Sequence, residues 1–349
     1  MKTLQWTIII SMVIGIIVYS FYSFQVDGEQ VQSDDEQEGL EDQVVIKFSH
    51  VVAENTPKGL AAQRFASLVQ QKTDNRVKVE VYPNGSLYRD EAELEALQQG
   101  SIQMIAPAST KLSEQFPPLA LLDLPFAFSS HEHVQEALEG SIGEELKQRA
   151  QNDQMLSLSI WNNGFKQMTS NQGPLIEPED FKGERFRVMP GDVIKSQFQA
   201  LGAQPETASF NVTYQKLASG ELTGQENTLS NIYSKRFYEV QSHLTLSNHG
   251  LLSYVVLMNK DFWEELSSEI QQVIQEAMDE ATQWNYDNAI TLNEKAKEHI
   301  QDQSDIEVHR LTEEERELWE SEVEVVYEQF RSEIGGELIE MLAGLREEN

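Results

Sequence analysis

Hydrophobic positions in the first third of the chain alternate between two spacings. Residues 77–82 alternate apolar and polar side chains, which is the period of a strand. Pro57 opens a segment with apolar positions at helical spacing. Residues 91–99 read as a second helix that Gly100 ends, and residues 102–106 as a buried strand. With a first strand before Pro57, this order predicts a parallel sheet with right-handed crossovers.

A second unit of the same kind begins near Lys166. Residues 185–189 read as a strand, and residues 193–201 and 211–218 as amphipathic helices. The apolar run at 251–258 predicts a buried strand that returns towards the first unit.

Long helices dominate the last third of the chain. Residues 267–303 contain neither Gly nor Pro, which predicts one long helix, or two with a kink, spanning both units. Residues 313–330 and 337–345 follow as amphipathic helices. The predicted fold is therefore α/β, with two units, chain crossings between them and a cleft.

Composition excludes several kinds of chemistry. The 349 residues include no cysteine, which excludes thiolate catalysis, cysteine-ligated metals and disulfides. The net charge of −32 argues against nucleic acid as a partner, because binding phosphates requires a basic face. No phosphate loop, dinucleotide turn or nucleophile elbow occurs, and residues 131–133 (His-Glu-His) lack further ligands at metal-site spacing. We expect no enzyme activity, no metal and no cofactor.

The N-terminus predicts an extracytoplasmic protein. Residues 6–24 carry no charge and follow Lys2, and as a helix they would be roughly 28 Å long. We interpret residues 1–25 as an uncleaved signal anchor, with a cleaved signal peptide as the alternative. Residues 26–43 are acidic and nearly devoid of large apolar groups, so we expect an extended linker to a domain tethered at the outer face of the cell membrane.

The sequence also contains residues suited to binding a small organic acid. Arg187 ends a predicted strand, where a guanidinium can offer two parallel donors to a carboxylate. Gly224–Thr228, which we expect to be a turn, contributes the amide of Asn227.

From Val44 to about Gly335 the chain resembles the extracytoplasmic solute-binding proteins of TRAP transporters, specifically their C4-dicarboxylate-binding branch. The resemblance rests on six ordered segments: Ile46–His50, Val79–Gly85, Asp123–Phe126, Asn163–Lys166, Gly224–Ile232 and Lys235–Gln241.

This resemblance implies two lobes, joined by a hinge, that close on a ligand. We expect lobe I to comprise residues 44–163 and 251–290, and lobe II to comprise residues 164–250 and 291–349. Arg187 matches the anchoring arginine of the family and Asn227 its ligand-facing asparagine. Lys166 is a candidate for the second carboxylate, with a surface lysine beside the hinge as the alternative.

Three further residues are weaker candidates. Phe210 is either the apolar floor of the site or a core side chain. His50 and Thr110 follow strands whose carboxyl ends should face the cleft, although His50 could equally be a buried histidine without ligand contact. Thr223 stands where relatives usually carry aspartate, so a charge near the hinge is missing.

The leading functional hypothesis is a monomeric receptor for succinate, fumarate or malate that serves a TRAP-type permease. The alternative is a sensory co-receptor that reports dicarboxylate occupancy to a membrane sensor kinase. Both place a binding protein beside a membrane partner.

Overall fold

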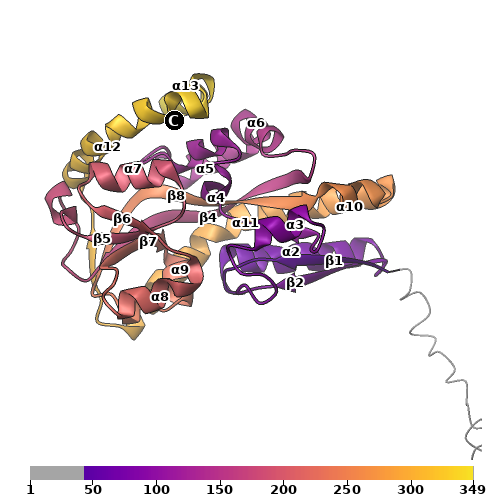
Figure 1. The fold of residues 1–349 in the computed structure, drawn as a ribbon, viewed down its shortest axis with the longest axis horizontal. Coiled ribbons are helices and arrows are strands. Elements are labelled where there is room, and N and C mark those ends of the chain that lie inside the picture. The colour runs from indigo at the N-terminus through magenta and orange to yellow at the C-terminus, as the bar shows by residue number, and fades with distance from the viewer. Residues whose placement is uncertain (1–42, 349) are drawn as a thin grey trace, which may run out of the picture. The chain divides into compact units, whose positions relative to one another are not determined.

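A computed structural model describes residues 43–348, whose strands form one continuous nine-stranded sheet (Figure 1). The strands run in the spatial order β2-β1-β3-β8-β4-β7-β5-β6, with β9 paired to β8. Their bounds are β1 (Val44–Ser49), β2 (Val77–Tyr82), β3 (Met104–Ile105), β4 (Met155–Ser170), β5 (Arg185–Val188), β6 (Gln204–Thr207), β7 (Gly224–Thr228), β8 (His243–Asn259) and β9 (Glu307–Arg310).

Helices pack against the sheet and close the chain. Their bounds are α2 (Pro57–Lys72), α3 (Glu93–Gln98), α4 (Ser109–Leu112), α5 (His131–Glu139), α6 (Ser141–Arg149), α7 (Asp192–Ala200), α8 (Phe210–Ala218), α9 (Leu229–Ser234), α10 (Lys260–Glu265), α11 (Ser268–Gln303), α12 (Glu313–Ile334) and α13 (Gly336–Glu348). Three short 3₁₀ helices are η3 (Pro117–Asp123), η4 (Pro178–Phe181) and η5 (Phe237–Glu239). The long helix α11 is unbroken over 36 residues, and Ser267 caps its first turn.

Strand directions explain where a site can form. β1 runs parallel to β2 and β3, and β5 runs parallel to β6 and β7, which confirms both predicted parallel units. The long strands β4 and β8 pair antiparallel along most of their length and connect the two units. β3 pairs antiparallel with β8, and β7 antiparallel with β4, so the two units point their carboxyl ends at each other. Ligands of α/β sheets gather at such ends.

Two expectations about strands were wrong. Gly224–Thr228 is not a turn but the strand β7, which is buried between β4 and β5. Its side chains are polar yet find partners inside the protein, so its hydrophobic pattern gave no strand signal. The sixteen-residue strand β4 was also missed, because polar residues interrupt its apolar run between Ile160 and Phe165.

The ladder between β4 and β8 breaks near the middle, and α11 supports the break. A register shift lies between Asn162 and Gly164, and Gly164 has a φ of 105°. Asn285 accepts a hydrogen bond from the Asn162 amide at 2.8 Å. Asn293 donates to the carbonyl of Asn163 at 2.8 Å, and a Cβ on Gly164 would lie 2.7 Å from this side chain. The buried asparagines therefore replace hydrogen bonds that the ladder loses.

Each half of the sheet has its own aromatic cluster. Phe48 packs on Phe65 and Trp161 in the first half. In the second half, Phe181 packs on Phe186, Phe198 and Trp319. The fold is mixed α/β and two-lobed, as expected, while the lobe boundaries given above stay predictions.

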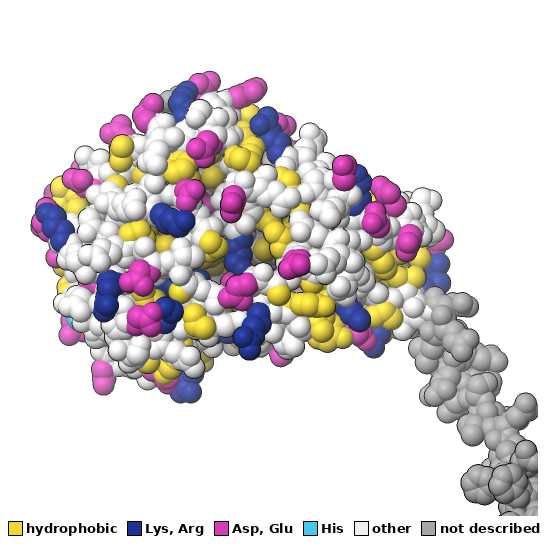
Figure 2. Space-filling model, in the orientation of Figure 1, with side chains coloured by type: hydrophobic (Ala, Val, Ile, Leu, Met, Phe, Trp, Pro, Cys, Tyr) yellow, Lys and Arg dark blue, Asp and Glu magenta, His cyan; other side chains and the backbone are white. Residues whose placement is uncertain are grey.

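Residues 1–42, which hold the predicted anchor and nearly all of the predicted acidic linker, lie outside the described residues. Among residues 43–348, no helix is both long enough and apolar enough to cross a membrane. On the face shown in Figure 2, acidic and basic side chains are dispersed among each other.

Candidate functional site

A small cavity lies where the carboxyl ends of the two strand sets meet. It has about 30 Å³ of room for the centres of water molecules, which suits a ligand of few atoms. Its walls come from the segments after β1, β2 and β3, from the end of β5, from β7 and β8, and from the starts of α8 and α9. The lining residues are Val51, Val52, Asp90, Ala108, Lys111, Arg187, Met189, Phe210, Asn227, Asn231, Leu252 and Tyr254.

Arg187 lines this cavity, and its guanidinium has a hydrogen-bond donor without a partner among residues 43–348. The residue is only 2% exposed on β5, and its Nε donates to the carbonyl of Ala208 at 2.9 Å. Nη1 is buried and has no hydrogen-bond partner in the described structure. Burial lowers the pKa of Arg187 from its ordinary value, but an arginine stays charged at neutral pH. A buried cation with an unused donor is suited to a carboxylate.

Two asparagines stand beside this cation. Asn231 donates from Nδ2 to Oδ1 of Asn227 at 2.8 Å, and the same Oδ1 accepts from the backbone of Thr228 at 3.1 Å. The oxygen of Asn227 is thus used within the protein, and its nitrogen is the half of the amide that can donate to an anion. Asn231 Oδ1 is buried and has no partner in the described structure.

Apolar and aromatic groups form much of the remaining wall. Phe210 lies with its ring centroid 6.0 Å from Cζ of Arg187 and 5.0 Å from Nζ of Lys235. It also packs edge-on against Phe237 at 6.0 Å, so it serves both the wall and the core. Such a surface suits the carbon chain of a ligand whose charged ends reach the polar groups.

Charged groups from the first half of the sheet complete the site. Lys111 forms an ion pair with Asp90, and both line the cavity. Behind the cavity wall, Nζ of the buried Lys58 lies 3.6 Å from the ring centroid of Tyr254. Burial lowers the pKa of Lys58 to about 7. Because Arg187 and Lys111 outnumber Asp90, the lining carries a net positive charge, which favours an anionic ligand.

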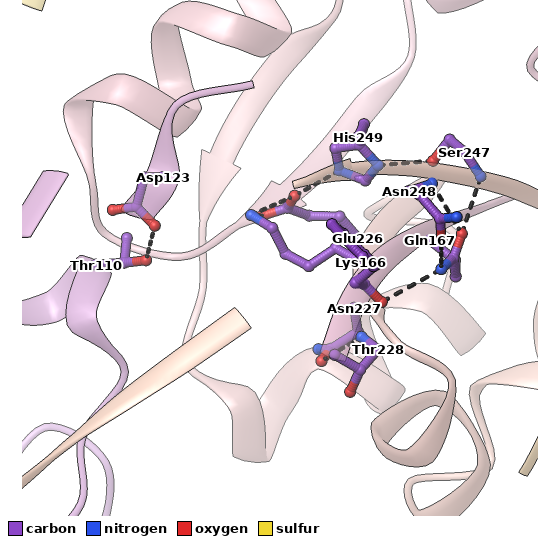
Figure 3. Close-up of polar contacts among 11 residues, drawn as sticks. Thr110, Asp123, Lys166, Gln167, Glu226, Asn227, Thr228, Ser247, Asn248 and His249 are labelled. Atoms are coloured by element: carbon purple, nitrogen blue, oxygen red, sulfur yellow. Dashed lines mark hydrogen bonds and ion pairs between the residues drawn. The ribbon is translucent and has the colours of Figure 1, made fainter. Parts of the chain in front are cut away.

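Lys166 does not reach this cavity in the described structure. Its fully buried Nζ lies 2.8 Å from Oε2 and 3.0 Å from Oε1 of Glu226, and Nε2 of His249 lies 2.9 Å from Oε2 (Figure 3). Burial alone raises the pKa of Glu226, but Lys166 and His249 outweigh it and lower that pKa to about 2. The charge of Lys166 is therefore neutralised within the protein.

His50 and Thr110 lie next to the lining rather than in it. His50 is buried, and burial together with Lys58 lowers its pKa to about 3, so the ring is neutral. Thr110 donates to Asp123 at 2.5 Å (Figure 3). Burial raises the pKa of Asp123 to about 6.

The sequence pointed to two of the segments that line this cavity but not to all of the lining residues. Val51, Val52 and Lys111 lie one or two positions from His50 and Thr110, so the rule about carboxyl ends located the segments and not these side chains. Asn231 lies in the first turn of α9, directly after Gly224–Thr228, and its polar type beside that segment could have revealed it. Tyr254 lay within an apolar run and gave no such signal.

Thr223, the departure noted in the sequence, has a structural role. Its hydroxyl accepts from the amide of Arg185 at 2.8 Å and donates to the same residue's carbonyl at 3.3 Å. Thr223 thereby joins the start of β5 to the residue before β7.

Comparison with known proteins agrees with this geometry. Residues 48–333 match the family model described as bacterial extracellular solute-binding protein, family 7. The chain is 46% identical over 340 residues to the C4-dicarboxylate-binding protein DctB of Bacillus subtilis, covering 97% of each. It is 40% identical to the C4-dicarboxylate-binding periplasmic protein DctP of Rhodobacter capsulatus, covering 86% of this chain and 90% of that protein.

Solved structures show the same fold. A TRAP periplasmic solute-binding protein from Shewanella oneidensis with bound succinate superposes with a TM-score of 0.84 at 38% identity, covering 87% of this chain and 99% of that one. A TRAP periplasmic solute-binding protein from Pseudomonas aeruginosa with bound L-malate superposes with a TM-score of 0.79 at 34% identity. The match covers 82% of this chain and 99% of that one. The predicted family is confirmed. The chain belongs to the DctP family of bacterial extracellular solute-binding proteins and is a binding protein rather than an enzyme.

Proposed function

We propose that this protein is an extracytoplasmic receptor that binds a C4-dicarboxylate and delivers it to a TRAP-type secondary transporter. The observation that carries the proposal is the buried, incompletely paired guanidinium of Arg187, which lines a small cavity of net positive charge. One ligand carboxylate is held by Arg187 with the amide nitrogen of Asn227, whose oxygen Asn231 holds in place. The other lies towards Lys111, and the carbon chain lies against Phe210.

Calorimetry with a panel of organic acids tests this assignment. Succinate, fumarate and L-malate should bind with micromolar or tighter affinity. This corresponds to a binding free energy of about −8 kcal/mol or a more negative value. Propionate, with one carboxylate, should bind at least tenfold more weakly because it loses one charge-assisted contact. Equal affinity for propionate and succinate would contradict a site for two carboxylates.

We further propose that the ligand closes the two lobes. Arg187, Asn227 and Phe210 lie in one half of the sheet and its helices, whereas Val51, Asp90 and Lys111 lie in the other. A ligand that contacts both sets stabilises the closed state by its greater affinity for that state.

We expect the radius of gyration to fall by roughly 1 Å with saturating succinate. Small-angle scattering with and without ligand measures this change, and propionate serves as the control. An unchanged profile under confirmed binding would show that closure does not accompany binding.

We also propose that residues 1–25 remain attached as a membrane anchor. The uncharged run from Trp6 to Phe24 is long enough to span a bilayer. N-terminal sequencing of the membrane fraction should therefore begin at or near Met1. A start between Gln25 and Asp42 would show cleavage instead.

A sensory role stays the alternative to transport. Succinate uptake by a strain lacking this chain distinguishes the two roles, because unchanged uptake favours sensing.

A further inference from the structure

A second cavity lies apart from the ligand cavity and shares no lining residue with it. It has about 60 Å³ of room for the centres of water molecules, roughly twice that of the first. Its walls come from β4, β8, β9 and α11 and from the starts of α5 and α9. Its polar lining includes His131, Gln167, Asn248, Asn293, Lys297 and Arg310.

The lining of the second cavity is positively charged although the chain carries a net charge of −32. Lys297 of α11 and Arg310 of β9 supply two cations, and Glu294 is the one carboxylate among the lining residues. Lys297 pairs with Glu294, whose side chain is 55% exposed, whereas that of Lys297 is 19% exposed. The cation therefore lies deeper than the carboxylate that accompanies it.

Neutral polar groups of this cavity have unused hydrogen-bonding capacity. Gln167 donates to Oδ1 of Asn248 at 2.6 Å and accepts from the amides of Ser247 and Asn248 (Figure 3). These contacts occupy the oxygen of Asn248 and leave its Nδ2 as a donor. His131 Nδ1 is buried and has no hydrogen-bond partner in the described structure, and burial lowers the pKa of this ring.

We propose that the second cavity is a binding site for a small oxyanion, held by Arg310 and Lys297 and oriented by the amide of Asn248. Two cations and a neutral donor outnumber the one carboxylate of the lining, and such donors suit the tetrahedral or planar oxygens of an oxyanion. This site is separate from the proposed dicarboxylate site and does not depend on Arg187.

Direct contacts connect the second cavity with the first. Gln167 of β4 is the cross-strand partner of Asn227 of β7, which lines the ligand cavity. Asn293 accepts through Oδ1 from the amide of Ser230 at 2.9 Å, and the next residue is Asn231 of the ligand cavity. An ion that orders Asn248 therefore acts, through Gln167, on the strand position of Asn227 in the ligand cavity. By linkage, the oxyanion and the dicarboxylate alter each other's affinity by the same factor.

Equilibrium dialysis of the full-length chain with radiolabelled sulfate tests the site. The Arg187→Ala variant serves as background, because it removes the anion clamp of the first cavity. We expect one saturable site per chain in this background, measured against chloride at matched ionic strength. Adding Arg310→Gln or Lys297→Gln should weaken sulfate binding at least fivefold. Adding Lys295→Gln, an exposed position on the same helix outside the lining, should leave it unchanged.

The absence of a saturable site would overturn the proposal, and so would equal sulfate binding after Arg310→Gln and after Lys295→Gln. Because Arg187→Ala has already disabled the first cavity, neither result bears on the dicarboxylate assignment. Coupling is measured with wild-type protein, whose succinate affinity should change at least twofold when sulfate replaces chloride. This change should disappear in Arg310→Gln. An unchanged succinate affinity would overturn the coupling.

Discussion

Arg187→Ala should abolish dicarboxylate binding while the protein remains folded. The substitution removes a two-pronged donor and leaves a ligand carboxylate without its partner in a buried cavity. The expected cost is about 3–5 kcal/mol, which is at least two orders of magnitude in affinity. Titration calorimetry with succinate measures it, and circular dichroism verifies the fold.

Arg185→Ala is the matched control for this prediction. Arg185 lies two positions earlier on β5, but its guanidinium donates to the carbonyl of Gly220 and does not line the cavity. Its loss should change succinate affinity less than threefold. If Arg187→Ala binds succinate within about fivefold of wild type, Arg187 is not the clamp.

Glu226→Gln should destabilise the fold by about 3–5 kcal/mol, because it leaves the fully buried cation of Lys166 without its carboxylate. Urea unfolding measures the loss. Glu179→Gln is the matched control: Glu179 pairs with Lys182, and both side chains are about two-thirds exposed. Its effect should be much smaller than that of Glu226→Gln, because water screens an exposed ion pair. A loss below about 1 kcal/mol in Glu226→Gln would contradict the importance of the buried pair.

The buried pair of Glu226 and Lys166 also predicts how the stability of the fold depends on pH. The pKa of Glu226 is lowered from 4.5 to about 2 in the folded protein. Between these values the unfolded chain binds a proton that the folded chain does not, so stability falls as pH drops from 4.5 towards 2. Asp123 acts in the opposite sense, because its pKa is raised from 3.8 to about 6. Glu226→Gln should therefore flatten the loss of stability below pH 4.5, as measured by urea unfolding at several pH values.

The fold was predictable wherever hydrophobic periodicity was strong. The helix α11 and the parallel strands β2 and β5 follow directly from their patterns. β4 and β7 did not, because their polar residues are satisfied by partners far away in the sequence. Gln167, for example, contacts Asn248, and Lys166 contacts Glu226. Periodicity records burial of apolar groups and contains no information about such pairings.

The same limit applies to the candidate site. Arg187, Asn227 and Phe210 were proposed from residue type and resemblance, and the structure places all three around one cavity. For Lys166, residue type could not show whether the cation faces a ligand or an internal carboxylate. That depends on the register of β4 against β7, which brings Glu226 to Lys166. Lys111, rather than Lys166, is a lysine that lines the cavity, because its short helix α4 follows β3.

The place of β8 in the sheet has a consequence for biogenesis. This strand lies between β3 and β4, yet it follows them by many residues in the chain. While a nascent chain ends before His243, neither β3 nor β4 has the neighbour that joins the two halves, and their facing edges stay unpaired. Such long-range pairing forms slowly, and unpaired edges invite aggregation. The order of strands therefore delays completion of the sheet, and the unpaired edges of β3 and β4 make the chain prone to aggregation until β8 is inserted.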